Sequence, residues 1–144
     1  MIPPFTATGT LPEGVHPASW QEFYGRFGTN AFRLWLIDGI EAALAALELA
    51  GCRFVYVDGS FVTNEPYPRD WDACWEEDGV NLEMLDDVFF EFANGRIAQK
   101  AKYRGECFPA SMAEGATKTT MLDFFQRDRT TGNAKGIVAL RLRE

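Results

Sequence analysis

The stretch that decides the fold is FVYVDGS at residues 54–60, followed after a gap of nine residues by DWDA at residues 70–73. The first stretch is an apolar run typical of a strand, and it ends in a Gly-Ser pair typical of a turn. Successive side chains of a strand point to opposite faces, so Asp70 and Asp72 are predicted to lie on one face. Two carboxylates on one rigid face form a hard oxygen site suited to Mg²⁺ or Mn²⁺.

The Gly-Ser pair is the second candidate feature. Glycine lets the backbone approach a ligand closely, so the N–H groups after Gly59 are predicted to bind phosphate together with Ser60. The alternative for Ser60 is a turn hydroxyl that bonds its own backbone. A phosphate-binding turn beside a divalent-metal site is the minimal equipment for moving a nucleotide.

The order Val-Asp-Gly-Ser (57–60), spacer, Asp-Trp-Asp-Ala (70–73) resembles the signature of the DNA polymerase beta-type nucleotidyltransferase superfamily. The resemblance covers about residues 52–126, and the whole chain is similar to a group of small prokaryotic nucleotidyltransferase-like proteins. It implies an α+β fold, a nucleotidyltransferase-like mixed β-sheet with helices packed mainly on one face. Asp58 departs from the pattern, because an apolar residue is more usual directly before the glycine.

Members of this superfamily carry a third carboxylate on a later strand. The segment Met-Leu-Asp-Phe-Phe at residues 121–125 places Asp123 in a strand-like setting. The resemblance therefore implies Asp70, Asp72 and Asp123 as catalytic residues and metal ligands, with Asp123 also placed to take the proton of the attacking hydroxyl. Three clustered carboxylates repel one another, which gives such a site an electrostatic reason to bind Mg²⁺ or Mn²⁺.

A basic segment is predicted to form a helix over about residues 94–103. Arg96 and Lys100 are four residues apart, so they share one face of that helix. If this face borders the carboxylates, both side chains can neutralise the charge of a bound triphosphate. The alternative is a solvated helix face with no ligand.

The remaining elements are predicted from caps, apolar periodicity and turn residues. Residues 1–17 are rich in proline and predicted to form an extended arm of a single domain that spans residues 1–144. A capping box at Ser19 opens a short helix that Gly25 or Gly28 ends. Further helices are expected from near Asn30 to Gly51 and at 82–88, and strands at 53–58, 70–75, 106–110, 119–126 and 135–142. Residues 131–133 supply a hairpin turn between the last two strands, and residues 89–92 are a strand or an extended link.

Composition excludes several classes of protein. The chain has 144 residues, is 47% hydrophobic and carries a formal charge of −7, which favours one globular domain and disfavours indiscriminate binding to nucleic acid. Three cysteines without a Cys-x-x-Cys spacing and a single histidine do not form the pattern of a zinc site. The first residues lack the pattern of a secretory signal, and charges in the segment near 31–50 exclude a membrane span, so a cytoplasmic protein is expected.

These features favour an enzyme, a metal-dependent nucleotidyltransferase that moves a nucleoside monophosphate from a nucleoside triphosphate to a protein or RNA hydroxyl. The resemblance also fits a toxin–antitoxin or phage-defence setting with a cognate partner protein. The alternative is a catalytically inactive nucleotidyltransferase-like module that binds a partner protein or a nucleotide. Carboxylates of Asp70, Asp72 and Asp123 that converge in one open cleft would favour the enzyme.

Overall fold

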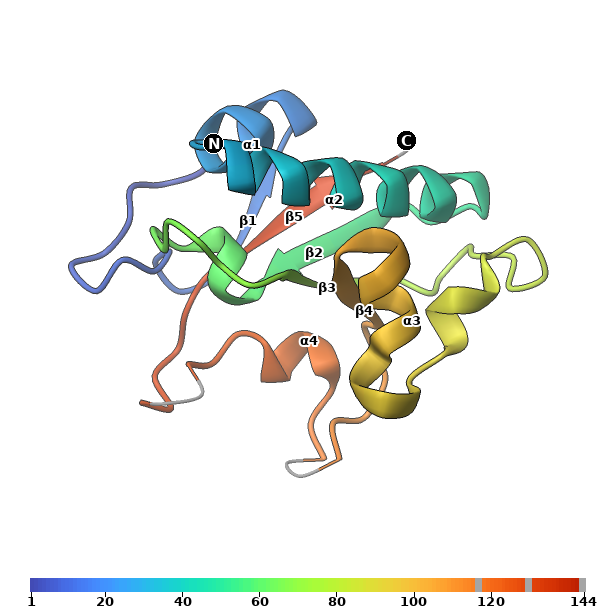
Figure 1. Cartoon of the computed structure of the whole chain (residues 1–144). Coiled ribbons are helices and arrows are strands. Elements are labelled where there is room, and N and C mark those ends of the chain that lie inside the picture. The colour runs from blue at the N-terminus through green and yellow to red at the C-terminus, as the bar shows by residue number, and fades with distance from the viewer. Residues whose placement is uncertain (116–117, 129–130, 143–144) are drawn as a thin grey trace.

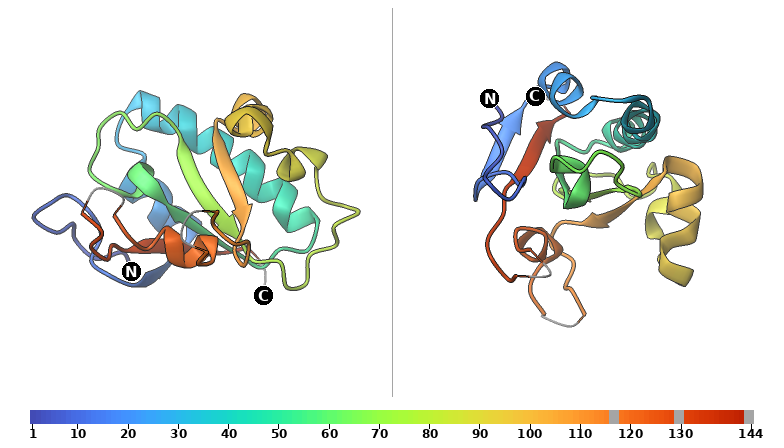
Figure 2. Two further views of the ribbon diagram at one scale, coloured as in Figure 1. Left: turned by 90° about the horizontal axis from the view of Figure 1, so that it is seen from below. Right: turned by 60° about the vertical axis from the view of Figure 1, so that its left-hand side comes forward.

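A five-stranded mixed β-sheet organises the computed structural model, which describes residues 1–115, 118–128 and 131–142. The strands are β1 (Val15–Ala18), β2 (Phe54–Asp58), β3 (Trp71–Trp75), β4 (Gly105–Pro109) and β5 (Ile137–Arg141). They lie in the order β1-β5-β2-β3-β4. β2 is antiparallel to both of its neighbours, whereas the outer pairs β1–β5 and β3–β4 are parallel (Figure 2). The predicted α+β class and mixed sheet are therefore confirmed.

Helices cover both faces of this sheet unequally (Figure 1). They are α1 (Trp20–Phe27), α2 (Ala31–Leu49), α3 (Ala93–Tyr103) and the short α4 (Met121–Phe124), with 3₁₀ turns η1 (Gly59–Val62) and η2 (Asp87–Phe90). α1 and α2 lie on one face, α4 lies on the other, and α3 flanks the β4 edge. Among the described residues, no helix has the length and apolar character that a bilayer span requires.

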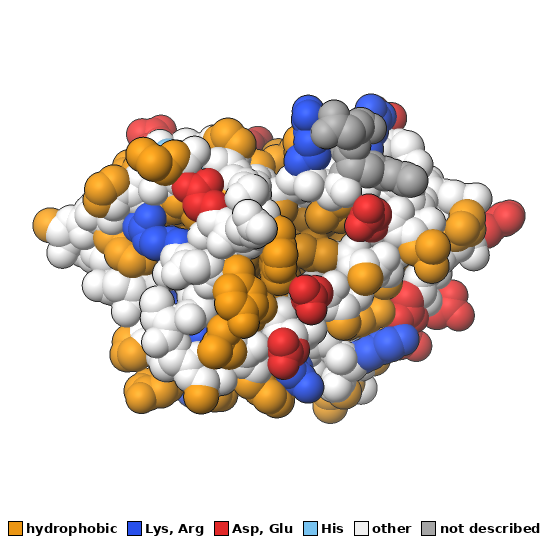
Figure 3. Space-filling view, turned by 90° about the horizontal axis from the view of Figure 1, so that it is seen from above, with side chains coloured by type: hydrophobic (Ala, Val, Ile, Leu, Met, Phe, Trp, Pro, Cys, Tyr) orange, Lys and Arg blue, Asp and Glu red, His pale blue; other side chains and the backbone are white. Residues whose placement is uncertain are grey.

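The larger core lies between the sheet and the α1–α2 layer. Alternate residues of the central strands point into it, and one stripe of α2 packs against them. Its fully buried members include Leu36, Ile40, Val55, Val57, Trp71 and Ala73. On its outer side this layer leaves hydrophobic side chains exposed between charged ones (Figure 3), with Trp35 at 48% the most exposed aromatic residue of α2.

The predicted cap at Ser19 is present, and the helix predicted to start near Asn30 is capped by that residue. The Ser19 hydroxyl accepts a hydrogen bond from the N–H of Glu22 at 3.1 Å, and α1 ends before Gly28 as expected. The Asn30 side chain accepts from the N–H of Arg33 at 2.8 Å and opens α2. These side chains satisfy backbone donors that have no partner inside the helix, which fixes where each helix begins.

The strand predicted at residues 119–126 is wrong, because this segment contains α4. The hydroxyl of Thr120 accepts a hydrogen bond from the N–H of Asp123 at 3.1 Å, so Thr-x-x-Asp acts as a helix cap. The predicted hairpin with the last strand is also wrong, because β5 pairs with β1 and β2, while the residues around the predicted turn form an isolated bridge between Arg127 and Ala134. Asp123 therefore lies on a helix rather than on a strand.

Two further predictions need correction. Residues 82–88 form turns that lead into η2, where Asp86 caps the 3₁₀ turn by accepting from the N–H of Val88 at 3.1 Å. The end of the arm predicted at residues 1–17 forms β1, which pairs with β5 from Val15↔Ile137 onward. β1 is an edge strand, so Pro17 within it deprives the sheet of no donor that an inner strand would need.

A buried arginine fixes the segment that follows β2. Arg33 is only 2% exposed, and its guanidinium donates to the carbonyl oxygens of Phe61 at 2.8 Å and Thr63 at 2.9 Å. It also donates to the carbonyls of Phe27 and Glu65. A planar guanidinium has five N–H donors in a fixed geometry and can serve four carbonyls at once, whereas a lysine ammonium has three. Arg33 thus ties η1 and the loop after it to the start of α2.

We expect Arg33→Met to lower the free energy of unfolding by roughly 2–4 kcal/mol, because several buried carbonyls would lose their donor. Urea denaturation followed by circular dichroism measures the change. Arg53→Met is the matched control, since Arg53 forms an exposed ion pair with Asp78 at 3.2 Å worth below about 0.5 kcal/mol. Equal losses in the two variants would contradict the structural role of Arg33.

Candidate functional site

Four carboxylates lie on the face of the sheet opposite α2. Asp58 of β2 is paired with Asp72 of β3, and Asp72 is paired with Glu106 of β4. Residues paired across strands share a face, and Asp70 precedes Asp72 by two residues, so it shares that face as well. We refer to Asp58, Asp70, Asp72 and Glu106 as the acidic row.

The Gly-Ser turn lies directly against this row. Gly59 has φ = 74°, a left-handed conformation, and a Cβ atom at this position would lie 2.4 Å from Oδ2 of Asp72. Any other residue would therefore collide with the Asp72 carboxylate as well as strain the backbone. Ser60 follows on the surface, and its carbonyl accepts from the hydroxyl of Thr63 at 2.6 Å. The structure thus brings together the two motifs that the sequence separates by nine residues.

The junction between α3 and β4 positions Glu106. Arg104 caps the C-terminus of α3 with a left-handed φ of 66°, and β4 begins at the next residue. Gly105 packs under the indole of Trp71, where a Cβ would lie 2.3 Å from a ring atom. The indole N–H of Trp71 donates to the carbonyl of Tyr103 at 2.8 Å. These close contacts place the first residues of β4 beside those of β3.

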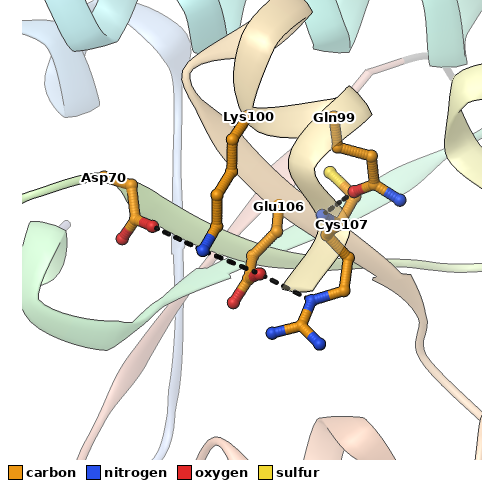
Figure 4. Close-up of polar contacts among 6 residues, drawn as sticks. Asp70, Gln99, Lys100, Glu106 and Cys107 are labelled. Atoms are coloured by element: carbon orange, nitrogen blue, oxygen red, sulfur yellow. Dashed lines mark hydrogen bonds and ion pairs between the residues drawn. The ribbon is translucent and has the colours of Figure 1, made fainter. Parts of the chain in front are cut away.

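Basic side chains of α3 contact the acidic row (Figure 4). The helix face that carries them is therefore not simply solvated, which was the alternative prediction for this segment. Nε of Arg96 lies 2.8 Å from Oε2 of Glu106. Nζ of Lys100 lies 3.7 Å from Oδ2 of Asp70 and 3.8 Å from Oε2 of Glu106. Gln99 holds the helix in place, because its side-chain oxygen accepts from the N–H of Cys107 at 2.7 Å.

Asp58 is the most unusual member of the row. It is fully buried, and neither carboxylate oxygen has a hydrogen-bond partner. Burial, and next the charge of Asp72, raise its pKa well above the ordinary value, while Lys135 opposes the shift. Asp58 therefore holds its proton more tightly than an exposed aspartate does.

Asp72 and Glu106 share a hydrogen bond, and their pKa values shift in opposite directions. Burial and the hydrogen bond with Glu106 raise the pKa of Asp72 well above its usual range. Burial opposes ionisation of Glu106 too, but hydrogen bonds from Asp72 and Arg96 outweigh it and lower the pKa of Glu106. The pKa of Asp70 is raised by burial and by the charge of Glu106, against the effect of Lys100. Within this hydrogen-bonded pair, the shifts favour the proton on Asp72 and the negative charge on Glu106.

Glu106 is the carboxylate that sequence reasoning missed. The sequence does contain a sign of it, because a glutamate begins the otherwise apolar strand predicted at 106–110, directly after the basic helix. Asp123, predicted for the third position, is exposed on α4. It lines a cavity of about 810 Å³ together with residues that include Glu13, Phe124 and Gln126. Glu106 is the nearer neighbour of Asp72, since the two residues are paired across adjacent strands.

The row has the chemistry of a divalent-cation site but not its arrangement. Carboxylate oxygens are the ligands that Mg²⁺ and Mn²⁺ prefer. In the described part of the chain, however, no group of three His, Cys, Asp or Glu side chains is disposed to hold a metal ion. Lys100 and Arg96 supply the positive charge around Glu106 instead.

Comparison with protein families places residues 3–141 in a family described as "Family of unknown function (DUF6932)". The match covers nearly the whole chain, so the chain belongs to this family. Comparisons with curated proteins and with solved structures gave no match.

We expect Asp58→Asn to be increasingly stabilising as the pH rises above about 4. The folded-state pKa of Asp58 is raised, so the native protein binds more protons than the unfolded chain and loses stability with rising pH. Asparagine does not ionise, so the variant gains about 1.4 kcal/mol over wild type per pH unit in which native Asp58 keeps its proton.

Denaturation by urea between pH 4 and pH 8 measures this difference. A difference between Asp58→Asn and wild type that stays constant over this range would show that Asp58 titrates normally.

Proposed function

We propose that the protein is a metal-dependent nucleotidyltransferase that moves a nucleoside monophosphate from a nucleoside triphosphate to a hydroxyl of a protein or RNA. The observation that carries the proposal is the contact between the Gly-Ser turn and the acidic row, where Gly59 lies against Oδ2 of Asp72. Nucleotidyl transfer needs positioning and neutralisation of charge rather than covalent chemistry by the protein. A phosphate-binding turn beside clustered carboxylates meets both needs.

In this proposal Asp70, Asp72 and Glu106 hold Mg²⁺ or Mn²⁺. When bound, the ions neutralise the phosphoryl oxygens and lower the pKa of the attacking hydroxyl. Glu106 replaces Asp123 as the favoured third carboxylate, because its strand adjoins that of Asp72 and its pKa is lowered. An ionised Glu106 can also accept the proton of the attacking hydroxyl. The role first predicted for Asp123 stays a prediction.

The other residues of the site bind and orient the nucleotide. Backbone N–H groups after Gly59, with the exposed Ser60 hydroxyl, bind the terminal phosphates at the turn that follows β2. Lys100 and Arg96 lie across the row from that turn and offset triphosphate charge. The nucleotide-binding set is thus Gly59, Ser60, Arg96 and Lys100, as the sequence predicts.

The acceptor and the setting belong to the same proposal. The net charge of −7 disfavours a long nucleic-acid footprint, so a protein hydroxyl or a short RNA end is the better acceptor. A cytoplasmic enzyme with a cognate protein, as in toxin–antitoxin or phage-defence pairs, fits this chemistry because the cytoplasm supplies nucleoside triphosphates.

The second candidate function is an inactive module that binds a nucleotide or a partner protein. One observation favours it: the carboxylates are engaged by Lys100 and Arg96 rather than disposed around a common metal position. A fold can persist after its chemistry is lost. This reading predicts that no component of a lysate becomes labelled.

Transfer activity separates the two functions. The protein is incubated with each labelled nucleoside triphosphate, Mg²⁺ or Mn²⁺ and cell lysate, and labelled protein and RNA are measured. We expect Asp72→Asn and Glu106→Gln each to lower transfer about 100-fold or more, because both side chains are proposed to hold the metal ion that the transition state needs. Ser60→Ala should lower it less, since backbone N–H groups remain.

Asp123→Asn is the matched control and should change transfer by less than about threefold. The opposite ranking, with Asp123→Asn inactive and Glu106→Gln active, would restore Asp123 as the third carboxylate. Wild-type protein that labels nothing with any triphosphate under either metal would support the inactive module instead.

A further inference from the structure

The outer face of α2 is exposed along most of the helix. It is defined by a stripe of five exposed residues, Trp35, Asp38, Ala42, Ala45 and Leu49. Their spacing alternates between three and four residues, so they lie one above another on the helix surface. Four of the five are apolar, and the stripe runs from a tryptophan that is 48% exposed to a leucine that is 72% exposed.

The charges exposed on α2 are all negative. They belong to Asp38, Glu41 and Glu48. The one basic residue of this helix, Arg33, is 2% exposed and is bound to carbonyl oxygens on the inner side. Figure 3 shows hydrophobic and acidic side chains next to one another on this side of the molecule. The outer face of α2 is therefore apolar along its middle and acidic around it.

Trp35 is held in place although it is exposed. Its ring centre lies 5.9 Å from that of Phe32, and the guanidinium of Arg104 lies 4.4 Å from it. Arg104 also donates to the carbonyl of Trp35 at 2.6 Å. A side chain that is ordered before binding loses little conformational entropy when a partner covers it. An ordered, exposed tryptophan is the kind of side chain that contributes most of the affinity at protein interfaces.

We propose that the outer face of α2 binds a basic amphipathic helix of a partner protein. The alternating spacing is the one used by helices that pack side by side. Alanine at positions 42 and 45 lets the two helix axes approach to about 8 Å. Apolar side chains of the partner then cover Trp35 and Leu49, and its lysines or arginines pair with Glu41 and Glu48.

The length of the face sets the length of the partner helix. From Trp35 to Leu49 the helix rises by about 21 Å, which is roughly four turns. A partner helix of about 15 residues covers this distance.

Charge argues against three other occupants. A two-fold contact between copies of the chain would bring the same face together twice, and so place carboxylates against carboxylates. RNA and anionic membrane surfaces are repelled by Asp38, Glu41 and Glu48. A basic protein is attracted by these residues and by the net charge of −7.

The proposal does not depend on transfer activity. α2 lies on one face of the sheet, and the acidic row lies on the other. A partner on α2 therefore docks away from the row, and the interaction holds whether the protein is an enzyme or an inactive module.

The probe is a fluorescein-labelled amphipathic peptide of about 15 residues, with leucines along one stripe of its helix and lysines on both sides of it. A matched peptide carries glutamate in place of every lysine. Fluorescence anisotropy measures the affinity of the full chain for each peptide. We expect the lysine peptide to bind at least about tenfold more tightly than the glutamate peptide.

Two substitutions test whether the peptide binds at this face. Ala45→Arg adds bulk and positive charge in the middle of the stripe, and should weaken binding of the lysine peptide about tenfold or more. Glu41→Lys should weaken it about fivefold through charge alone. Both residues are exposed, so the fold should persist, and circular dichroism checks this.

The matched controls make the same changes elsewhere on the surface. Ala93→Arg alters an exposed alanine at the end of α3 away from α2, and Glu13→Lys alters a residue of the cavity beside α4. Each should change the affinity for the lysine peptide by less than about twofold, because charges distant from the bound peptide are screened by salt.

Four results with the peptides would overturn the proposal. They are absence of binding by the lysine peptide, equal affinity for both peptides, unchanged affinity in Ala45→Arg, and losses in the controls equal to those in the test variants. Sedimentation of the protein, and binding of single-stranded RNA and of anionic vesicles, test the other occupants. A dimer, or binding of RNA or vesicles, that Ala45→Arg abolishes would assign the face to that occupant and overturn the proposal as well.

Discussion

Three carboxylates lie side by side on neighbouring strands, those of Asp58, Asp72 and Glu106. The rest of the site depends on how their mutual repulsion is offset. Carboxylates this close cannot all be ionised in a buried position. Burial raises the pKa of both Asp58 and Asp72, which favours their neutral forms, and α3 supplies positive charge beside Glu106. The left-handed turn that opens α3 and the tight junction that ends it are both explained by this requirement, since together they hold the helix against the β4 edge.

A second constraint acts on the opposite face. Arg33 donates hydrogen bonds to carbonyls of η1 and of the loop after it, which fixes the Gly-Ser turn from the α2 side. Asp72 contacts the same turn from the opposite side. Preorganised backbone donors need this kind of support, because a turn free to move would lose its advantage in binding phosphate. The core and the candidate site are therefore joined through one short segment, residues 59–65.

Local sequence patterns predicted the elements whose signals are local. The caps at Ser19 and Asn30, the strand before Gly59 and the shared face of Asp70 and Asp72 follow from neighbouring residues. Glu106 could not be assigned in the same way, because its place beside Asp72 depends on a parallel pairing between strands over thirty residues apart. Asp123 was misplaced for a local reason: its aromatic neighbours favour a strand, but the Thr120 cap decides for a helix.

The position of β5 has a consequence for how the chain acquires its structure. β5 (Ile137–Arg141) is the last strand along the chain, yet it lies between β1 and β2 and pairs with both. Until residue 141 has left the ribosome, β1 has no partner and one edge of β2 stays open. Assembly of the sheet must therefore wait for the synthesis of β5 and close contacts across more than 110 residues of sequence, a topology that slows folding and exposes strand edges in the nascent chain.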